Sequence, residues 1–243
     1  MRVVLVSDVH LGGPDDPTQA EFLEFLRTLE CDRLMLLGDI FQHWWHFPTG
    51  IWACFARASA TKPTIFREYE PVIEALSRFN VGFVPGNHDF CASSYFPSSG
   101  PVVLETWDGT RVHLTHGDEV DVSFGYGVVS EIVRGRLFGA VVTCLGPRRA
   151  WRFLSAIAHP PRGEPDTALV DLQRVLAARR IAAGADLVVM GHTHAPELTR
   201  VGSGWFANLG DWVSHRTYLV VEGGVPRLCH AGSAGVTAED RAR

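Results

Sequence analysis

The sequence predicts an α/β fold. Short apolar runs alternate with longer segments in which apolar residues recur at helical spacing, the pattern expected when helices cover a sheet. Several of the short runs end in a glycine and polar side chains, as in α/β proteins that place their chemistry where strands end. The chain has 243 residues, of which 46% are hydrophobic and 20% charged, ordinary values for a folded globular protein.

The first third of the chain predicts strands separated by helices. Predicted strands cover residues 2–7, 33–37 and 81–85, and predicted helices cover 18–30 and 71–80. The helix over 18–30 repeats apolar residues at helical spacing, among them Phe22, Leu26 and Leu29. The segment 41–69 is rich in aromatic residues. We expect a helical hairpin that packs these rings into the core, in preference to a ligand-binding role, because aromatic side chains usually supply buried area.

The second half predicts a hairpin, a further helix and four strands. Asp108-Gly109 lies between the apolar runs 102–105 and 111–115, which is a strong hairpin signal. His113, inside the second run, is interpreted as structural. Further strands are predicted at 186–190, 205–209, 216–221 and 225–229. The helix predicted over 166–183 has an expected buried stripe of Leu169, Leu172, Val175 and Leu176.

The segment 124–163 interrupts this alternation and predicts an insertion that forms a helical cap over the site. Between Glu131 and Glu164 there is no acidic residue, but there are six arginines. Residues 148–159 form a basic amphipathic helix pattern, with Trp151 on the apolar side. Its polar side carries Arg148, Arg149 and Arg152. We predict that these four residues bind substrate and that the arginines meet anionic headgroups; a solvated helix face and simple phosphate clamps are the alternatives.

The composition indicates the cellular compartment of the protein and argues against some classes of binding partner. The formal net charge of −5 argues against nucleic acid as the partner. The five cysteines are scattered without a C-x-x-C pair, which argues against a disulfide framework or a structural zinc site. No apolar run approaches the ~20 residues of a membrane-spanning helix, and Asp8 comes too early for a signal peptide. A soluble protein of the reducing cytoplasm is therefore expected.

Metal-capable residues follow five of the predicted strands. They are Asp8 and His10, Asp39, Asn87 and His88, His116, and His192 and His194. Each cluster alone has an ordinary structural explanation, but five clusters of carboxylate, amide and imidazole groups at strand ends indicate a metal centre. Oxygen and nitrogen ligands without thiolate suit Mn²⁺, Fe²⁺ or Zn²⁺. Two such ions about 3.5–4 Å apart can clamp the attacking and leaving oxygens of a phosphoryl displacement.

These clusters resemble the five ordered motifs of the calcineurin-like metallophosphoesterases. The motifs are Asp8-x-His10, Gly38-Asp39, Gly86-Asn87-His88-Asp89, His116-Gly117-Asp118 and Gly191-His192-x-His194. The resemblance implies a four-layer α/β/β/α sandwich, a single domain over residues 1–243, and two divalent ions. Manganese is favoured, with iron and zinc as alternatives.

The same resemblance implies a role for each motif residue. One metal is held by Asp8, His10 and His194, the other by Asn87, His116 and His192, and Asp39 bridges them. His88 is implied as the histidine beside the phosphate that binds no metal, with Asp89 as its orienting partner.

Within this family, Ser7-Asp8-Val9-His10-Leu11-Gly12 and Asn208-Leu209-Gly210-Asp211-Trp212 are similar to the UDP-2,3-diacylglucosamine diphosphatase group. That resemblance implies hydrolysis of a nucleotide-linked lipid to 2,3-diacylglucosamine 1-phosphate and UMP, with peripheral contact at the cytoplasmic face of the inner membrane. His88 departs from the best-known members, which carry arginine there. A soluble phosphodiesterase, phosphatase or nuclease on the same metal core is the alternative. A binding scaffold without activity would lack ligands, and none is missing here. The sequence predicts no oligomeric state.

Overall fold

The fold is taken from a computed structural model of the chain. It describes residues 1–13, 15–42, 44, 64–90, 92, 95–96, 102–121 and 166–232, without the side chains of 64–68 and 102–103. The predicted cap over 124–163 lies outside these ranges, and so do Arg148, Arg149, Trp151 and Arg152. Most of the hairpin predicted for 41–69 lies outside them as well. No helix within the described ranges is long and apolar enough to cross a membrane.

The first of two mixed sheets has five strands in the order β10-β9-β1-β2-β3. They are β1 (Arg2–Val6), β2 (Arg33–Leu37), β3 (Val81–Val84), β9 (Thr217–Glu222) and β10 (Val225–His230). β1, β2 and β3 are parallel, whereas β9 is antiparallel to both β1 and β10. The carboxyl ends of β1, β2 and β3 therefore meet at one edge of the sheet.

The second sheet has five strands in the order β4-β5-β6-β8-β7. They are β4 (Val102–Trp107), β5 (Thr110–Thr115), β6 (Leu187–Met190), β7 (Glu197–Val201) and β8 (Gly204–Asn208). β5, β6 and β8 are parallel, and β4 and β7 close the two edges in antiparallel pairs. The predicted hairpin is confirmed: Asp108 and Gly109 turn between β4 and β5 with φ of 50° and 85°, values that suit a two-residue hairpin turn.

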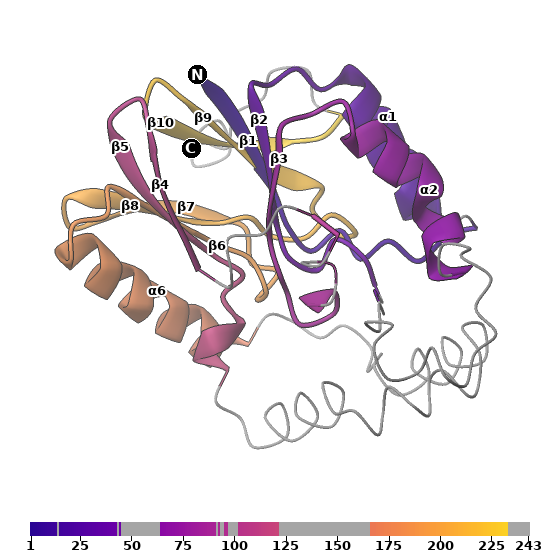
Figure 1. Cartoon of the computed structure of the whole chain (residues 1–243). Helices are drawn as coiled ribbons and strands as arrows, with labels where there is room; N and C mark the ends of the chain where they lie inside the picture. The colour runs from indigo at the N-terminus through magenta and orange to yellow at the C-terminus, as the bar shows by residue number, and fades with distance from the viewer. Residues whose placement is uncertain are drawn as a thin grey trace, which may run out of the picture.

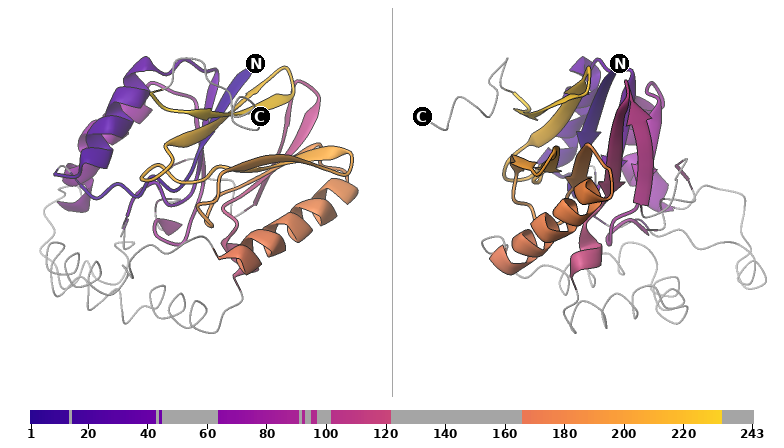
Figure 2. Two further views of the ribbon diagram at one scale, coloured as in Figure 1. Left: turned by 180° about the vertical axis from the view of Figure 1, so that it is seen from behind. Right: turned by 90° about the vertical axis from the view of Figure 1, so that its left-hand side faces the viewer.

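Three helices cover the outer faces of the two sheets. α1 (Pro17–Thr28) and α2 (Thr64–Leu76) pack on the first sheet, and α6 (Thr167–Ala182) packs on the second (Figures 1 and 2). Side chains alternate along β1, so Val4 and Val6 face the helices while Val3 and Leu5 face the second sheet. This alternation produces a core between the sheets and confirms the α/β prediction.

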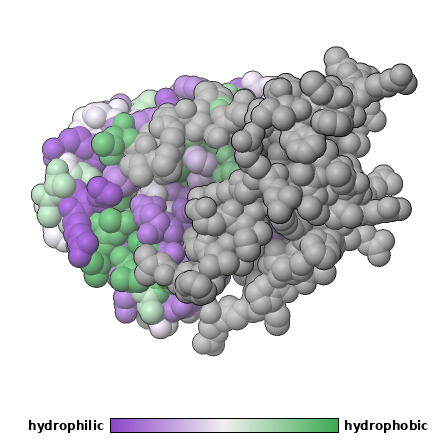
Figure 3. All heavy atoms as spheres, turned by 60° about the horizontal axis from the view of Figure 1, so that its bottom comes forward, coloured by the Kyte–Doolittle hydropathy of each residue, from purple (hydrophilic) through white to green (hydrophobic). Residues whose placement is uncertain are grey.

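The buried face of α6 differs from the predicted stripe. Leu172 and Val175 are 44% and 48% exposed, whereas Gln173, Ala177 and Ile181 are buried. Leu176 does pack against the core, but the prediction is wrong for Leu172 and Val175, because it ranked residues by hydropathy while Gln173 is held inside by hydrogen bonds to the second sheet. Its Nε2 donates to the Gly191 carbonyl at 2.9 Å. Figure 3 turns the bottom of the view in Figure 1 forward and shows apolar and polar residues of the described part mixed on that surface.

The helix predicted over 71–80 runs instead from Thr64 to Leu76, with Pro71 inside it. Proline is favoured in the first helical turn, which made Pro71 look like a helix start. The expectation for the aromatic residues holds where the structure describes them. Phe41, Trp44 and Tyr69 are buried, and the Phe41 ring centroid lies 4.5 Å from that of Trp44 and 4.9 Å from that of Tyr69. These rings are part of the core that α2 forms with the first sheet.

Candidate metal centre

The candidate site lies where strands from both sheets end. The Asp8 N–H donates to the Gly38 carbonyl at 3.0 Å, and the His10 N–H donates to the Asp39 carbonyl at 2.9 Å, so the loops after β1 and β2 run side by side. The loop after β6 in the second sheet joins them, because the His192 N–H donates to Asp8 Oδ2 at 3.0 Å. The structure thus brings residues far apart in the sequence to one edge.

Five non-glycine residues of these loops adopt a left-handed backbone. They are Asp8, His10, Asp39, His192 and His194, with φ between 53° and 72°. Such φ values cost a non-glycine residue on the order of 1–3 kcal/mol and persist only where the surroundings impose them, most often at functional sites. The strained backbone therefore coincides with the residues that the sequence motifs single out.

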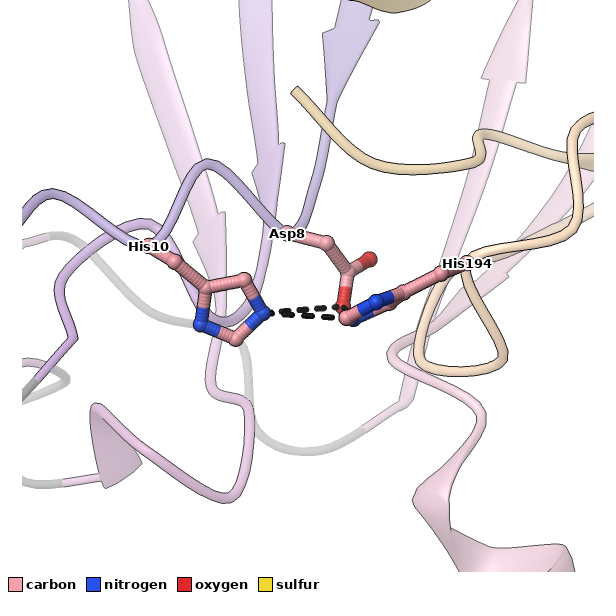
Figure 4. A group of neighbouring side chains, drawn as sticks. All are labelled: Asp8, His10 and His194. Atoms are coloured by element: carbon pink, nitrogen blue, oxygen red, sulfur yellow. Dashed lines mark hydrogen bonds and ion pairs between the residues drawn. The ribbon is translucent and has the colours of Figure 1, made fainter. Parts of the chain in front are cut away.

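Asp8, His10 and His194 form a first group of possible ligands (Figure 4). The Nε2 atom of His194 lies 3.2 Å from Asp8 Oδ1 and 3.2 Å from His10 Nε2. Asp8 Oδ1 and His10 Nε2 are 3.9 Å apart. These three atoms surround one point, as ligands of a single ion would.

Asp39 stands at the centre of a second group. Its Oδ2 lies 3.5 Å from His116 Nε2, and that nitrogen lies 3.2 Å from Asn87 Oδ1. Asp8, Asp39 and His116 also bring one ligand atom each within 4.8 Å of one another. Asp39 Oδ1 accepts a hydrogen bond from the His88 N–H at 2.9 Å, which holds the carboxylate between the two groups.

His88 lies beside both groups. Its Nε2 is 3.8 Å from Asp39 Oδ2, and its ring meets that of His10 edge-on, with centroids 5.0 Å apart. Its side chain is 21% exposed. Its Nδ1 lies 3.0 Å from the Gln42 carbonyl oxygen. That carbonyl can only accept, so it orients the ring and leaves Nε2 facing the centre.

Asp89 does not orient His88 in the way the resemblance implies. Both Asp89 carboxylate oxygens instead accept backbone hydrogen bonds, one of them from the Asp39 N–H at 3.1 Å. The other donors are the N–H groups of Gly86, Ile40 and Phe41. The prediction is corrected: Asp89 joins the loops after β2 and β3, and the Gln42 carbonyl holds His88.

His192 is placed near the centre, but it belongs to no three-ligand group among the described residues. Its ring centroid lies 5.2 Å from that of His116, and its Nε2 lies 4.0 Å from Asp121 Oδ2. The Nδ1 of His116 lies 2.8 Å from the Leu37 carbonyl oxygen, which turns Nε2 of that ring inward.

The charge states of Asp39 and His10 suit cation binding, whereas His116 must first lose a proton. Burial alone would raise the pKa of Asp39, but the imidazoles of His116 and His88 hold it well below its usual range. Burial lowers the pKa of His10 to about 3, so this ring is neutral and able to ligate. At His116, burial lowers the pKa, but the nearby carboxylates, chiefly that of Asp39, together have the larger effect and raise the pKa well above its ordinary value. Binding a metal at His116 would therefore release a proton.

The donor set fits divalent cations. Within the described residues Asp8 Oδ1 is fully buried and has no hydrogen bond of good geometry, with His194 Nε2 as its near neighbour at 3.2 Å, although burying an unpaired carboxylate oxygen is costly. A cation at the first group would satisfy that oxygen. Oxygen and nitrogen donors without thiolate suit manganese, iron and zinc alike.

Two glycines allow the strand ends to approach closely. A Cβ on Gly86 would lie 2.2 Å from Asp39 Oδ1, and a Cβ on Gly38 would lie 2.7 Å from His116 Nδ1. Both distances are shorter than any real contact. The glycines are therefore required for the Asp39 carboxylate and the His116 ring to occupy these positions.

Comparison with protein families agrees with this geometry. Residues 1–196 match the model of the calcineurin-like phosphoesterases. The chain belongs to this family. It is a metal-dependent phosphoesterase with clustered His and Asp residues suited to the dinuclear site typical of the superfamily.

Curated relatives cover most of the chain. A UDP-2,3-diacylglucosamine hydrolase of Bordetella parapertussis is 32% identical over 213 residues, which are 79% of this chain and 76% of that protein. The protein of the same name from Xanthomonas campestris pv. campestris is 29% identical over 248 residues, covering 91% and 96%. Among solved structures, the E. coli phosphoesterase Yfce is similar with a TM-score of 0.47 at 19% identity, covering 98% of each chain.

Sequence reasoning missed the residues that stand behind the site. Gln42 holds His88 through its backbone carbonyl, which no side-chain pattern reveals, and Asp121 follows the His116 motif without a recognisable pattern. Asp211 belongs to a stretch used above only as a family resemblance, yet its Oδ2 lies 3.5 Å from His194 Nδ1.

Proposed function

We propose that this phosphoesterase hydrolyses the pyrophosphate of UDP-2,3-diacylglucosamine to 2,3-diacylglucosamine 1-phosphate and UMP, using two divalent ions, with Mn²⁺ favoured. The observation that carries the proposal is the 32% identity, over 79% of the chain, to a protein named for hydrolysis of this substrate. The clustered carboxylates and imidazoles support the same chemistry.

The proposed ligand sets follow the two groups described above. Asp8, His10 and His194 would hold one ion, and Asn87, His116 and His192 the other, with Asp39 shared between them. A pair of such ions supplies Lewis acidity toward the phosphoryl oxygens and an activated water. Asp39 suits the shared position because a carboxylate offers two oxygens and offsets part of two positive charges.

His88 is proposed to stabilise charge on the phosphoryl group. Its Nε2 faces the centre and its side chain is partly exposed, so it can reach a bound substrate. A histidine can act as a positive clamp or can also release a proton near neutral pH. UMP and a sugar phosphate are good leaving groups and need little protonation, so the clamp role is expected for the lipid substrate.

The segment 124–163 is proposed as a cap within a single domain spanning residues 1–243. Arg148, Arg149, Arg152 and Trp151 would bind the substrate there. An apolar face can hold acyl chains while arginines meet anionic headgroups. This cap would place the enzyme on the cytoplasmic face of the inner membrane as a peripheral protein.

A second candidate, a soluble phosphodiesterase with the same metal core, is favoured by one observation. His88 stands where the best-known diacylglucosamine enzymes carry arginine. A proton-donating group at this position helps an alkoxide to leave, which a diester requires and a pyrophosphate does not.

The test compares three substrates in the presence of Mn²⁺: UDP-2,3-diacylglucosamine, the soluble diester bis-p-nitrophenyl phosphate, and an alkyl phosphodiester whose alkoxide leaves poorly. The kcat/KM values of wild type, His88→Ala and His88→Arg are measured on all three. We expect turnover of the lipid nucleotide, its loss in His88→Ala, and substantial recovery in His88→Arg, because arginine supplies a clamp but no proton.

Two results would reject the lipid proposal. One is turnover of either diester without turnover of UDP-2,3-diacylglucosamine. The other is an arginine variant as inactive as the alanine variant on the lipid nucleotide. Because general acid catalysis typically contributes ~10²–10⁴-fold, a loss of that size on alkyl diesters alone would identify the second candidate.

A further inference from the structure

A buried carboxylate from the loop between β8 and β9 lies behind His194. The Oδ2 of Asp211 is 3.5 Å from His194 Nδ1, and Asp211 is only 3% exposed. The opposite nitrogen of the same ring, Nε2, faces Asp8 and His10 (Figure 4). The His194 imidazole therefore lies between Asp8 and His10 on one side and Asp211 on the other.

The loop holds the Asp211 carboxylate in this position through its other oxygen. Asp211 Oδ1 accepts hydrogen bonds from the N–H of Ser214 at 2.7 Å and the N–H of His215 at 3.0 Å. The next residue ties the loop to the site, since the Trp212 N–H donates to the Asp8 carbonyl at 3.0 Å. Oδ1 is thus used by the turn, and Oδ2 is directed at His194.

A carboxylate behind a metal-ligating imidazole holds the ring proton on the nitrogen that does not bind the ion. With a cation on Nε2, a neutral His194 ring carries its proton on Nδ1, where Asp211 Oδ2 can only accept it; without the cation, Asp8 Oδ1 competes for a proton on Nε2. A carboxylate also makes the ring a more basic ligand than a carbonyl does. The rings of His116 and His88 face the backbone carbonyls of Leu37 and Gln42 instead.

We infer that Asp211 is a positioning residue that orients His194 and strengthens metal binding at the first group, Asp8, His10 and His194. The inference rests on the proposed dinuclear centre. It makes the two metal positions unequal, because removing Asp211 weakens one of them.

The test replaces one oxygen while keeping the turn. In Asp211→Asn, the side-chain oxygen can still accept from Ser214 and His215, whereas the amide nitrogen cannot accept from His194. Metal-free protein is titrated with Mn²⁺ by calorimetry, and metal content is measured by elemental analysis. We expect one of two equivalents to bind about 10–100-fold more weakly and the other to be unchanged.

Two controls separate this role from general packing. In His215→Ala, an imidazole 3.3 Å from Asp211 Oδ1 is lost while Oδ2 is untouched, so both equivalents should bind as in wild type. The melting temperature of metal-free Asp211→Asn should match that of metal-free wild type. Wild-type affinity for both equivalents in Asp211→Asn would overturn the inference, as would an equal loss in His215→Ala. Failure of wild type to bind two equivalents would instead reject the proposed centre.

A measurement on wild type applies even if Asp211→Asn does not fold. In the zinc-loaded protein, nitrogen-15 NMR of the histidine rings should show His194 with its proton on Nδ1 and a hydrogen-bonded proton shift. His194→Gln assigns the resonance. A His194 ring protonated on Nε2, or one whose Nδ1 proton exchanges as freely as that of an exposed histidine, would overturn the inference.

Discussion

Replacing Gly86 by alanine should disable the site without replacing any proposed ligand. The added Cβ would lie 2.2 Å from Asp39 Oδ1 and 2.5 Å from the Asp39 backbone nitrogen. The backbone cannot retreat easily, because the Gly86 N–H donates to Asp89 Oδ1 at 3.0 Å. The Asp39 carboxylate must therefore turn away and lose its hydrogen bond from the His88 N–H.

The magnitude follows from these contacts. Overpacking costs typically about 1–3 kcal/mol, and a hydrogen bond to a charged group contributes roughly 1.5–3 kcal/mol. These contributions overlap, so we expect a loss of about 2–4 kcal/mol. For a chain of this size that corresponds to a fall of roughly 5–15 °C in the melting temperature. The protein should stay folded, since domains typically have about 5–15 kcal/mol of stability.

Gly82→Ala, on the strand β3 that leads into Gly86, is the matched control. Its Cβ would lie 2.5 Å from Met35 Sδ, at the flexible end of a side chain that can move. We expect Gly86→Ala to bind less than one equivalent of Mn²⁺ by elemental analysis and to lose phosphoesterase activity, while Gly82→Ala keeps both. Wild-type metal content and activity in Gly86→Ala would refute the reasoning that close approach at Gly86 positions Asp39.

Three further predictions concern the ligands, a thiol and the cap. Asp39→Ala should retain less than one metal equivalent by elemental analysis, because the shared carboxylate is lost. Asn87→Ala should weaken the binding of one equivalent and leave the other unchanged. Two full equivalents in Asp39→Ala would contradict the bridging role. Burial raises the pKa of the Cys31 thiol to about 11. At pH 8 the alkylation of Cys31 should therefore be roughly a hundredfold slower than in unfolded protein, and it should accelerate as the pH rises. Peptide mass spectrometry measures both rates, and equal rates in folded and unfolded protein would contradict this prediction. The cap prediction concerns Arg148, Arg149 and Arg152. Reversing their charge should reduce liposome binding and lipid turnover but preserve hydrolysis of a soluble diester, and equal losses on both substrates would show that the cap supports the core instead.

The parts of the fold that the sequence predicts are those whose signal is local. β2 occupies the predicted residues because an apolar run ends there in Gly38 and Asp39. β7 was not predicted, because none of its residues is fully buried and its hydropathy pattern is weak. It forms by pairing with the neighbouring strand β8, for example between Arg200 and Trp205, so its partner and not its own hydropathy determines it. The error in the α6 stripe also comes from partners elsewhere, since Gln173 is buried by hydrogen bonds to Gly191 after β6 and to Asn208 on β8.

The candidate site likewise combines residues that local sequence motifs reveal with contacts that only the folded structure reveals. Ligand-capable residues stand beside glycines at strand ends, so the motifs around Asp8 and His116 are visible in the sequence. Contacts made through backbone atoms, such as the Gln42 carbonyl at His88, carry no residue signature. Asp211 lies 17 residues after His194, and only the packing of the second sheet brings its carboxylate behind that ring.

The convergence of two sheets at one edge has a consequence for folding. The first group takes Asp8 and His10 from the loop after β1 and His194 from the loop after β6, so an ion bound there would cross-link the two sheets. The Asp39 and His116 pair joins β2 to β5 in the same way. Ligation of the native state alone adds about 2.7 kcal/mol at a hundredfold excess over the dissociation constant. Chelation would thus loosen the interface between the sheets, and a substitution in the core between them, far from any ligand, would change metal affinity.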